Sequence, residues 1–94
     1  MRVYISGPIT GVKNFEENFK KAAERMAKNG HKVVNPAAVN DVFLDGTYEE
    51  YMQINLSLLA MCDAIYMMKG WQQSKGANRE YGFAKAAGMT ILEE

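Results

Sequence analysis

The segment DAIYMM, residues 63–68, decides the fold. The run after Asp63 is wholly apolar or aromatic, which is typical of a strand covered on both faces. Three more short β-type segments accompany it, namely RVYIS at 2–6, KVVN at 32–35 and MTIL at 89–92. Helical patterns separate these strands, so the sequence predicts a mainly parallel sheet of about four strands.

The helices are predicted from apolar spacing and from capping residues. Asn14 is a plausible N-cap for the first helix, and Thr47 with Glu50 forms a capping box for the second. Gly30 and Gly88 are natural stops for the first and third helices. The predicted ranges are 14–29, 47–61 and 74–87, with one more helical turn within 37–43.

These elements predict the fold class and the domain organisation. Strands that alternate with helices of this length form a small three-layer α/β fold, Rossmann-like or flavodoxin-like, with right-handed crossovers between parallel strands. A chain of 94 residues with 48% hydrophobic residues is expected to form a single domain over 1–94.

Composition limits the partners. Eleven basic residues balance eleven acidic ones, which argues against nucleic acid or a membrane surface and favours a small or neutral ligand. The apolar stretch 52–68 is interrupted by polar residues and is no membrane span. Cys62 is the only cysteine, so no internal disulfide is expected and a reducing cytoplasm is the simplest compartment. His31 is the only histidine, and neither a metal site nor a cofactor is expected.

Two glycine-containing loops are expected to meet at the ligand-binding edge of the sheet. Parallel α/β sheets bind ligands beyond the carboxyl ends of their strands. There the loops GPITG and KGWQQSKGA provide close backbone approach, hydroxyl groups and helix N-termini, which suit an anion such as phosphate. The candidate residues are Gly7, Thr10, Gly11, Ser74 and Gly76. The glycines could also be plain turn residues, and on this signal alone that interpretation is the stronger.

Four other side chains could carry chemistry. Glu80 shares a helix face with alanines; it could complement the helix dipole, or it could attack a sugar carbon as retaining glycosidases do. Asn55 lies in an apolar stripe and needs a polar partner, structural or catalytic. Tyr4 could orient a carboxylate or pack as a strand aromatic. Trp71 could lie over a nucleobase or fill a subunit interface.

Three segments together carry a family resemblance. YISGPITG, INLSLLAMCDAIYMM and SKGANREYGFA resemble the nucleoside 2-deoxyribosyltransferase-like superfamily, which includes the 2'-deoxynucleoside 5'-phosphate N-hydrolases, and above all its short bacterial and phage members. The resemblance implies that Glu80 is the nucleophile that attacks C1' of a 2-deoxyribose. It also implies that Tyr4 belongs to the catalytic group and that Ser74 holds a 5'-phosphate. The pocket for sugar and phosphate would be lined by Gly7, Ile9 and Gly11.

The chain departs from the family pattern at two positions. Asn55 stands where the family has an aspartate that protonates the leaving base, and an amide cannot act as a general acid. Thr10 stands where the hydrolases have an arginine.

The expected function is therefore cleavage or transfer of the N-glycosidic bond of 2'-deoxynucleosides or their 5'-monophosphates, with full or attenuated activity. A non-catalytic nucleotide-binding or sensing protein is the alternative, and an interaction module with a vestigial pocket is a third. Unpaired sheet edges and apolar helix faces predict a homodimer or larger assembly.

Overall fold

The computed structural model describes residues 1–94, except for the side chain of Asn40. It contains one four-stranded sheet in which every neighbouring pair of strands is parallel. The strands are β1 (Arg2–Ser6), β2 (Lys32–Val34), β3 (Ala64–Met67) and β4 (Thr90–Glu93). Their order in the sheet is β2-β1-β3-β4. The predicted small parallel α/β fold is confirmed.

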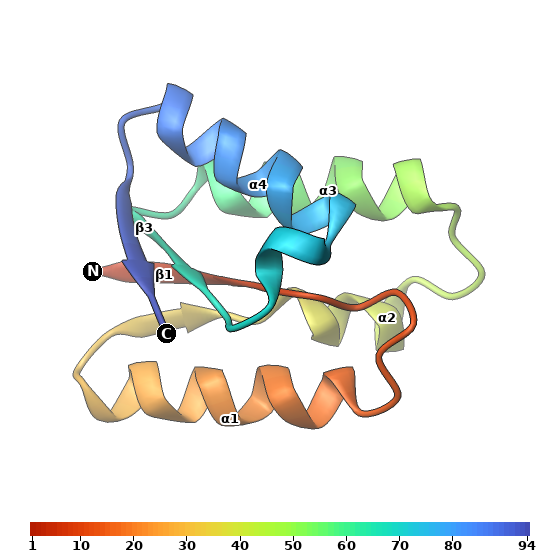
Figure 1. The fold of residues 1–94 in the computed structure, drawn as a ribbon, viewed down its shortest axis with the longest axis horizontal. Helices are drawn as coiled ribbons and strands as arrows, with labels where there is room; N and C mark the ends of the chain where they lie inside the picture. Colours follow the sequence, from red (N-terminus) through yellow and green to blue (C-terminus); the bar gives the residue numbers. More distant parts are fainter.

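Helices cover both faces of the sheet, which gives three layers (Figure 1). Helix α1 (Phe15–Lys28) lies on one side, and α3 (Tyr48–Ala60) with α4 (Lys75–Ala86) lies on the other. Short helical turns η1 (Pro36–Ala38) and α2 (Val39–Val42) occupy the segment where one turn was predicted. A further helical turn, η2 (Trp71–Gln73), follows Gly70, which has a φ of 85°. The sequence predicts a loop at these residues.

Side-chain alternation along β1 divides the core in two. Val3 and Ile5 pack with Phe19 and Met26 of α1. Tyr4 faces the other way and packs with residues of α3, α4 and β3. Because side chains of a strand alternate between faces, Ser6 must share the face of Tyr4. This face of the sheet is the one that α4 covers.

The helix ends follow the predicted signals with one exception. The capping box at Thr47 and Glu50 is present, since the Glu50 N–H donates to Thr47 Oγ1 at 3.1 Å and the Thr47 N–H donates to Glu50 Oε1 at 2.8 Å. Gly30 and Gly88 have φ of 88° and 73°, as expected after a helix. Asn14 is at the N-cap position of α1, but its side chain accepts no capping hydrogen bond. Only its backbone oxygen contributes, accepting from the Asn18 N–H.

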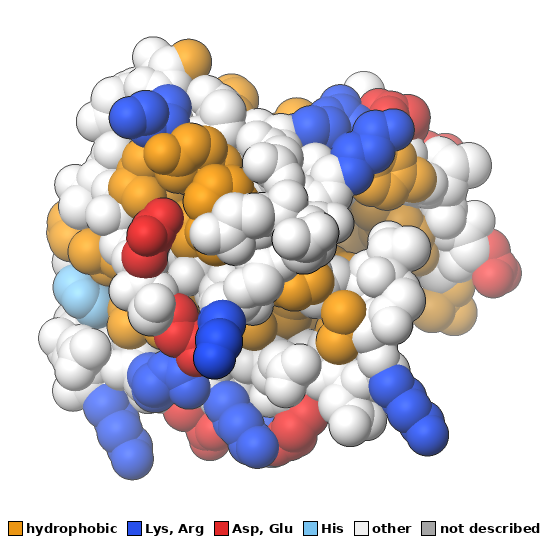
Figure 2. Space-filling view, viewed as in Figure 1, with side chains coloured by type: hydrophobic (Ala, Val, Ile, Leu, Met, Phe, Trp, Pro, Cys, Tyr) orange, Lys and Arg blue, Asp and Glu red, His pale blue; other side chains and the backbone are white. Residues whose placement is uncertain are grey.

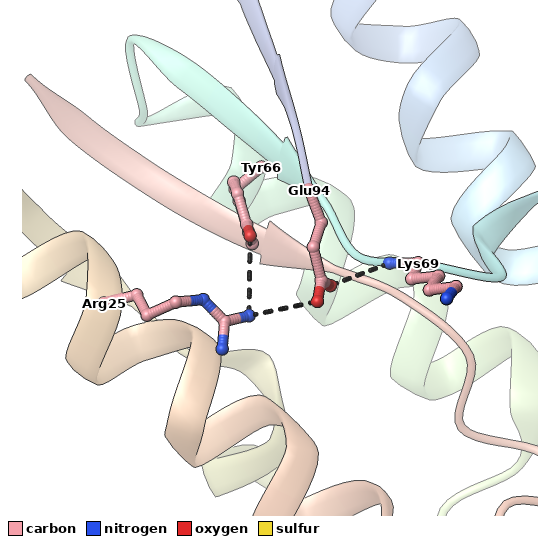
Figure 3. Close-up of polar contacts among 4 residues, drawn as sticks. All are labelled: Arg25, Tyr66, Lys69 and Glu94. Atoms are coloured by element: carbon pink, nitrogen blue, oxygen red, sulfur yellow. Dashed lines mark hydrogen bonds and ion pairs between the residues drawn. The ribbon is translucent and has the colours of Figure 1, made fainter.

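A polar cluster fastens the end of β4 to the α1 side of the molecule (Figure 3). Glu94 accepts a hydrogen bond from the backbone N–H of Lys69 at 2.9 Å and forms an ion pair of 3.5 Å with Arg25. Arg25 also reaches the hydroxyl of Tyr66 at 3.4 Å. The cluster joins α1, β3 and the loop after β3 at the carboxyl end of the sheet.

The surface carries both charges without a dominant sign. In the view of Figure 2, Lys and Arg side chains appear along the edge formed by α1 and again near α3 and α4, with acidic side chains between them. Hydrophobic side chains are recessed beneath the Lys and Arg side chains near α3 and α4. Among the described helices, none is long and apolar enough to cross a membrane.

Candidate active site

Helix α4 places Glu80 against the sheet. Ser74 caps this helix by accepting a hydrogen bond from the Ala77 N–H at 3.2 Å. The buried residues of α4 are Ala77, Glu80 and Ala84, which share one face of the helix. A Cβ atom on Gly76 would lie 3.3 Å from Met52 Sδ, so the glycine allows the first turn of α4 to approach α3 closely. The small residues of this helix thus bring a carboxylate into the interior.

Two hydroxyl groups of β1 hold the Glu80 carboxylate. Tyr4 Oη donates to Oε2 at 2.6 Å, and Ser6 Oγ donates to Oε1 at 2.7 Å. Tyr4 and Ser6 are both fully buried, and Glu80 is 5% exposed. A carboxylate has about four lone-pair positions, so each oxygen keeps one free after accepting one hydrogen bond. The arrangement fixes the carboxylate and leaves it able to react.

The surroundings of Glu80 shift its pKa in two opposite directions. Burial raises the pKa of Glu80 above its ordinary value, while the hydrogen bonds from Tyr4 and Ser6 act in the opposite direction. Burial, followed by the nearby charge of Glu80, raises the pKa of Tyr4 well above its ordinary value. Tyr4 therefore stays protonated and remains a hydrogen-bond donor over the whole range in which Glu80 titrates.

Glu80 forms part of the wall of a cavity of about 200 Å³ at the carboxyl edge of β1 and β3. This is the point where the strand order reverses, since β1 has β2 on one side and β3 on the other. The structure brings seven of the residues named from the sequence to this cavity, namely Gly7, Ile9, Thr10, Asn55, Ser74, Gly76 and Glu80. A second hollow of about 620 Å³ shares Thr10, Tyr48, Ser74 and Gly76 with the cavity and is also lined by Lys75.

Asn55 lines the cavity and is 7% exposed. Its side-chain oxygen has no hydrogen-bond partner among the described residues. An unpaired buried amide oxygen costs about 1 to 3 kcal/mol. A structural hydrogen bond was one of the two roles expected for the buried Asn55 side chain, and its oxygen does not make one.

The remaining residues named from the sequence lie elsewhere. Tyr4 is behind Glu80 and has no exposed surface. Trp71 stacks on Tyr81, with ring centroids 4.7 Å apart and an interplanar angle of 25°. Gly11 has a φ of 77° in the loop after β1. Of the described residues, those that line the cavity include neither Trp71 nor Gly11.

Sequence reasoning missed six residues of the site. Ser6 could have been found from strand alternation, since it is two residues after Tyr4. Tyr48, Tyr51 and Met52 line the cavity from α3, and their spacing was assigned only to the core. Pro36 and Ala77 complete the wall. Tyr51 is fixed in place, because its hydroxyl donates to the Phe43 carbonyl at 2.6 Å and accepts from the Gly46 N–H at 3.2 Å.

The cavity wall has the mixed composition that is usual for small-molecule sites. Aromatic and apolar groups form one part of the wall, and the oriented carboxylate and hydroxyl groups form another. Within the described part of the chain there is no group of three His, Cys, Asp or Glu side chains placed to hold a metal ion.

A solved structure with the same fold belongs to a 2-deoxyribosyltransferase from the psychrotolerant bacterium Bacillus psychrosaccharolyticus. The similarity has a TM-score of 0.77 and covers 99% of this chain and 71% of that one, at 16% sequence identity. The fold is thus that of the nucleoside 2-deoxyribosyltransferases. A family model described as "Domain of unknown function (DUF4406)" matches residues 1–93, and the chain belongs to this family. No curated protein matches it in sequence.

Proposed function

We propose that residues 1–94 form one deoxyribosyltransferase-like domain that cleaves or transfers the N-glycosidic bond of 2'-deoxynucleosides or their 5'-monophosphates. The observation that carries the proposal is the Glu80 carboxylate, buried in a cavity wall and oriented by hydroxyl donors at 2.6 and 2.7 Å. A buried carboxylate with neutral partners is costly to the fold, and such groups cluster at functional sites. The similarity to a solved 2-deoxyribosyltransferase supports the same reaction class.

In this proposal Glu80 is the nucleophile. One carboxylate oxygen attacks C1' as the bond to the base breaks, and water or a second base then releases the sugar from the enzyme. Tyr4 and Ser6 keep the carboxylate in the attacking orientation and favour its ionised form. Both hydroxyls are fully buried, so they act through Glu80 rather than on the substrate.

The first loop and the start of α4 would hold the sugar and a 5'-phosphate. From the first loop, Gly7, Ile9 and Thr10 line the cavity, and from the start of α4, Ser74 and Gly76 do so. Lys75 lines the adjoining hollow and supplies a positive charge there. Thr10, which stands where the related hydrolases have an arginine, supplies none. The α4 N-terminus adds unpaired N–H groups on this side.

We further propose that the protein is a cytoplasmic homodimer or larger assembly. Val42, Leu44 and Met61 expose 83%, 71% and 59% of their surface, and β2 and β4 are edge strands of the sheet. An assembly that covers these groups would remove apolar surface from water.

The reaction is tested with a panel of 2'-deoxynucleosides and their 5'-monophosphates, by following free base with chromatography. Glu80→Gln keeps the size of the side chain but removes the nucleophile, so it should abolish base release. Glu24→Gln, a change on the exposed face of α1, is the matched control and should retain full activity. Base release that persists in Glu80→Gln would exclude the proposed nucleophile.

A nucleotide-binding or sensing protein is the second candidate, and Asn55 is the observation that favours it. Its amide stands where the resemblance places a proton donor, and an amide cannot protonate a leaving base. This function predicts that nucleotides raise the melting temperature while no base is released from any of the panel. An interaction module with a vestigial pocket predicts no melting shift.

A further inference from the structure

The charges in the cavity wall suggest which leaving group the site can accept. Among the described residues that line the cavity, Glu80 is the only Asp, Glu, Lys, Arg or His. Its hydrogen-bond donors are the neutral hydroxyls of Tyr4 and Ser6, so its negative charge has no cationic partner there. A buried, uncompensated negative charge favours a ligand that carries a positive charge.

Aromatic side chains in the cavity wall also favour a cationic ligand. Tyr48 and Tyr51 present aromatic side chains to the cavity, and the faces of aromatic rings attract flat organic cations. The Asn55 amide carries no net charge, so it does not compensate the charge of Glu80. Two basic groups already lie over the Tyr48 ring, with Lys75 Nζ 5.4 Å and Arg79 Cζ 5.7 Å from its centroid, but neither residue lines the cavity that holds Glu80. Arg79 is also paired with Glu49 at 2.9 Å.

The described wall also lacks a second carboxylate. A retaining glycosidase uses one carboxylate as the nucleophile and another to protonate the leaving group. Asn55 has no acidic proton, and the Tyr51 hydroxyl donates its proton to the Phe43 carbonyl. Without a proton donor, a neutral purine or pyrimidine that departs from the site must leave as an anion.

We propose that the preferred substrates are cationic N-glycosides, in which the ring system attached to C1' already bears a positive charge, as in N7-alkylated purine or pyridinium nucleosides. This inference rests on the proposed function and names its substrate class. When the bond from C1' to nitrogen breaks, its electron pair neutralises the ring cation, and the base leaves neutral without a proton donor.

The remaining steps balance in the same way. A Glu80 oxygen forms the new bond to C1', and the carboxylate charge is lost in the resulting ester. Water then attacks C1', its proton passes to solvent, and the ester electron pair returns to Glu80 as carboxylate. The net reaction converts the cationic nucleoside and water into neutral base, free sugar and a proton.

The test compares 2'-deoxyguanosine with N7-methyl-2'-deoxyguanosine, which share sugar and ring size but differ in charge. Release of guanine or 7-methylguanine is followed by chromatography, and spontaneous loss in buffer and with Glu80→Gln is subtracted. The wild-type protein is expected to cleave the methylated nucleoside with a kcat at least about 10²-fold higher, because the neutral nucleoside lacks the 10² to 10⁴ contributed by a general acid.

Asn55→Asp supplies the missing acid and gives the second readout. It should raise kcat for 2'-deoxyguanosine by about 10² to 10⁴ and change kcat for the methylated nucleoside less than about threefold. Tyr48→Phe tests the other phenol of the described wall as a proton donor, and under this proposal it leaves the ratio between the two substrates unchanged. The wild-type comparison needs no variant and stands even if Asn55→Asp folds poorly.

The failures of the two proposals are distinguishable. Comparable kcat values for the two substrates in the wild type, or equal acceleration of both by Asn55→Asp, would overturn the preference for a cation but leave the glycosidase function intact. Selective loss of 2'-deoxyguanosine cleavage in Tyr48→Phe would likewise overturn the preference, since it would reveal a proton donor. If neither nucleoside is cleaved, the preference for a cation is overturned, and the panel of 2'-deoxynucleosides and 5'-monophosphates decides the proposed function separately.

Discussion

Tyr4→Phe isolates the contribution of one hydroxyl to the reactivity of Glu80. The variant keeps the buried ring and removes the donor to Glu80 Oε2 at 2.6 Å. A hydrogen bond to a charged group contributes about 1.5 to 3 kcal/mol, and every 1.36 kcal/mol is a factor of ten. Since this bond stabilises the ionised carboxylate, its loss makes the ionised form about 10- to 160-fold less populated at pH values where Glu80 titrates.

The sign of the pH effect follows from that loss. Burial raises the pKa of Glu80 and the Tyr4 hydrogen bond lowers it, so Tyr4→Phe raises this pKa further. The acid limb of the kcat/KM profile is expected to move to higher pH. Activity should fall by up to about 10- to 160-fold on the acid side, and the deficit should shrink as the pH rises above the limb.

The assay is base release from a cleaved nucleoside between pH 4 and 9, with melting temperature as a check on folding. Tyr66→Phe is the matched control, because it removes another largely buried phenol on the neighbouring strand, in the cluster that faces α1. Its acid limb should coincide with that of the wild type. An acid limb that stays in place in Tyr4→Phe would refute the orientation of Glu80 by Tyr4.

Three further outcomes are expected. Burial raises the pKa of Glu80, so the folded state loses stability as the pH rises above the unfolded-state pKa of about 4.3. Glu80→Gln should therefore have a higher melting temperature than the wild type at pH 8, and the difference should shrink towards pH 4. A difference in melting temperature that does not depend on pH would contradict this. Thr47→Ala removes the capping box and should lower the free energy of unfolding in urea by about 0.5 to 2 kcal/mol, with Ser57→Ala in the same helix as the milder control. Light scattering should give at least twice the chain mass of 10.5 kDa, and a monomeric mass would refute the proposed assembly.

Most of the fold follows from local sequence signals. The apolar run of β3 and the β-branched run of β1 specify central strands, and the capping box at Thr47 specifies the start of α3. The cap at Asn14 could not be predicted with the same success, because whether a side chain folds back onto the helix depends on the loop that precedes it.

The candidate site was only partly predictable for a different reason. Glu80 and Asn55 attract attention because each is a polar residue in an apolar stripe. The place of Trp71 depends on the turn that begins at Gly70, which directs the indole onto Tyr81 rather than towards the cavity. Tyr48 and Tyr51 have the spacing of core residues, and sequence alone does not distinguish a core face from a cavity wall.

The hydrogen bonds of Glu80 also bear on how the protein acquires its site during synthesis. They join β1 to α4 across 76 and 74 positions of the chain. Such distant contacts require most of the chain to be ordered first, and loops of this length form late in folding. A nascent chain on the ribosome can pair β1 with β2 and pack α1 before α4 has emerged. The oriented carboxylate therefore forms only after α4 has packed against β1.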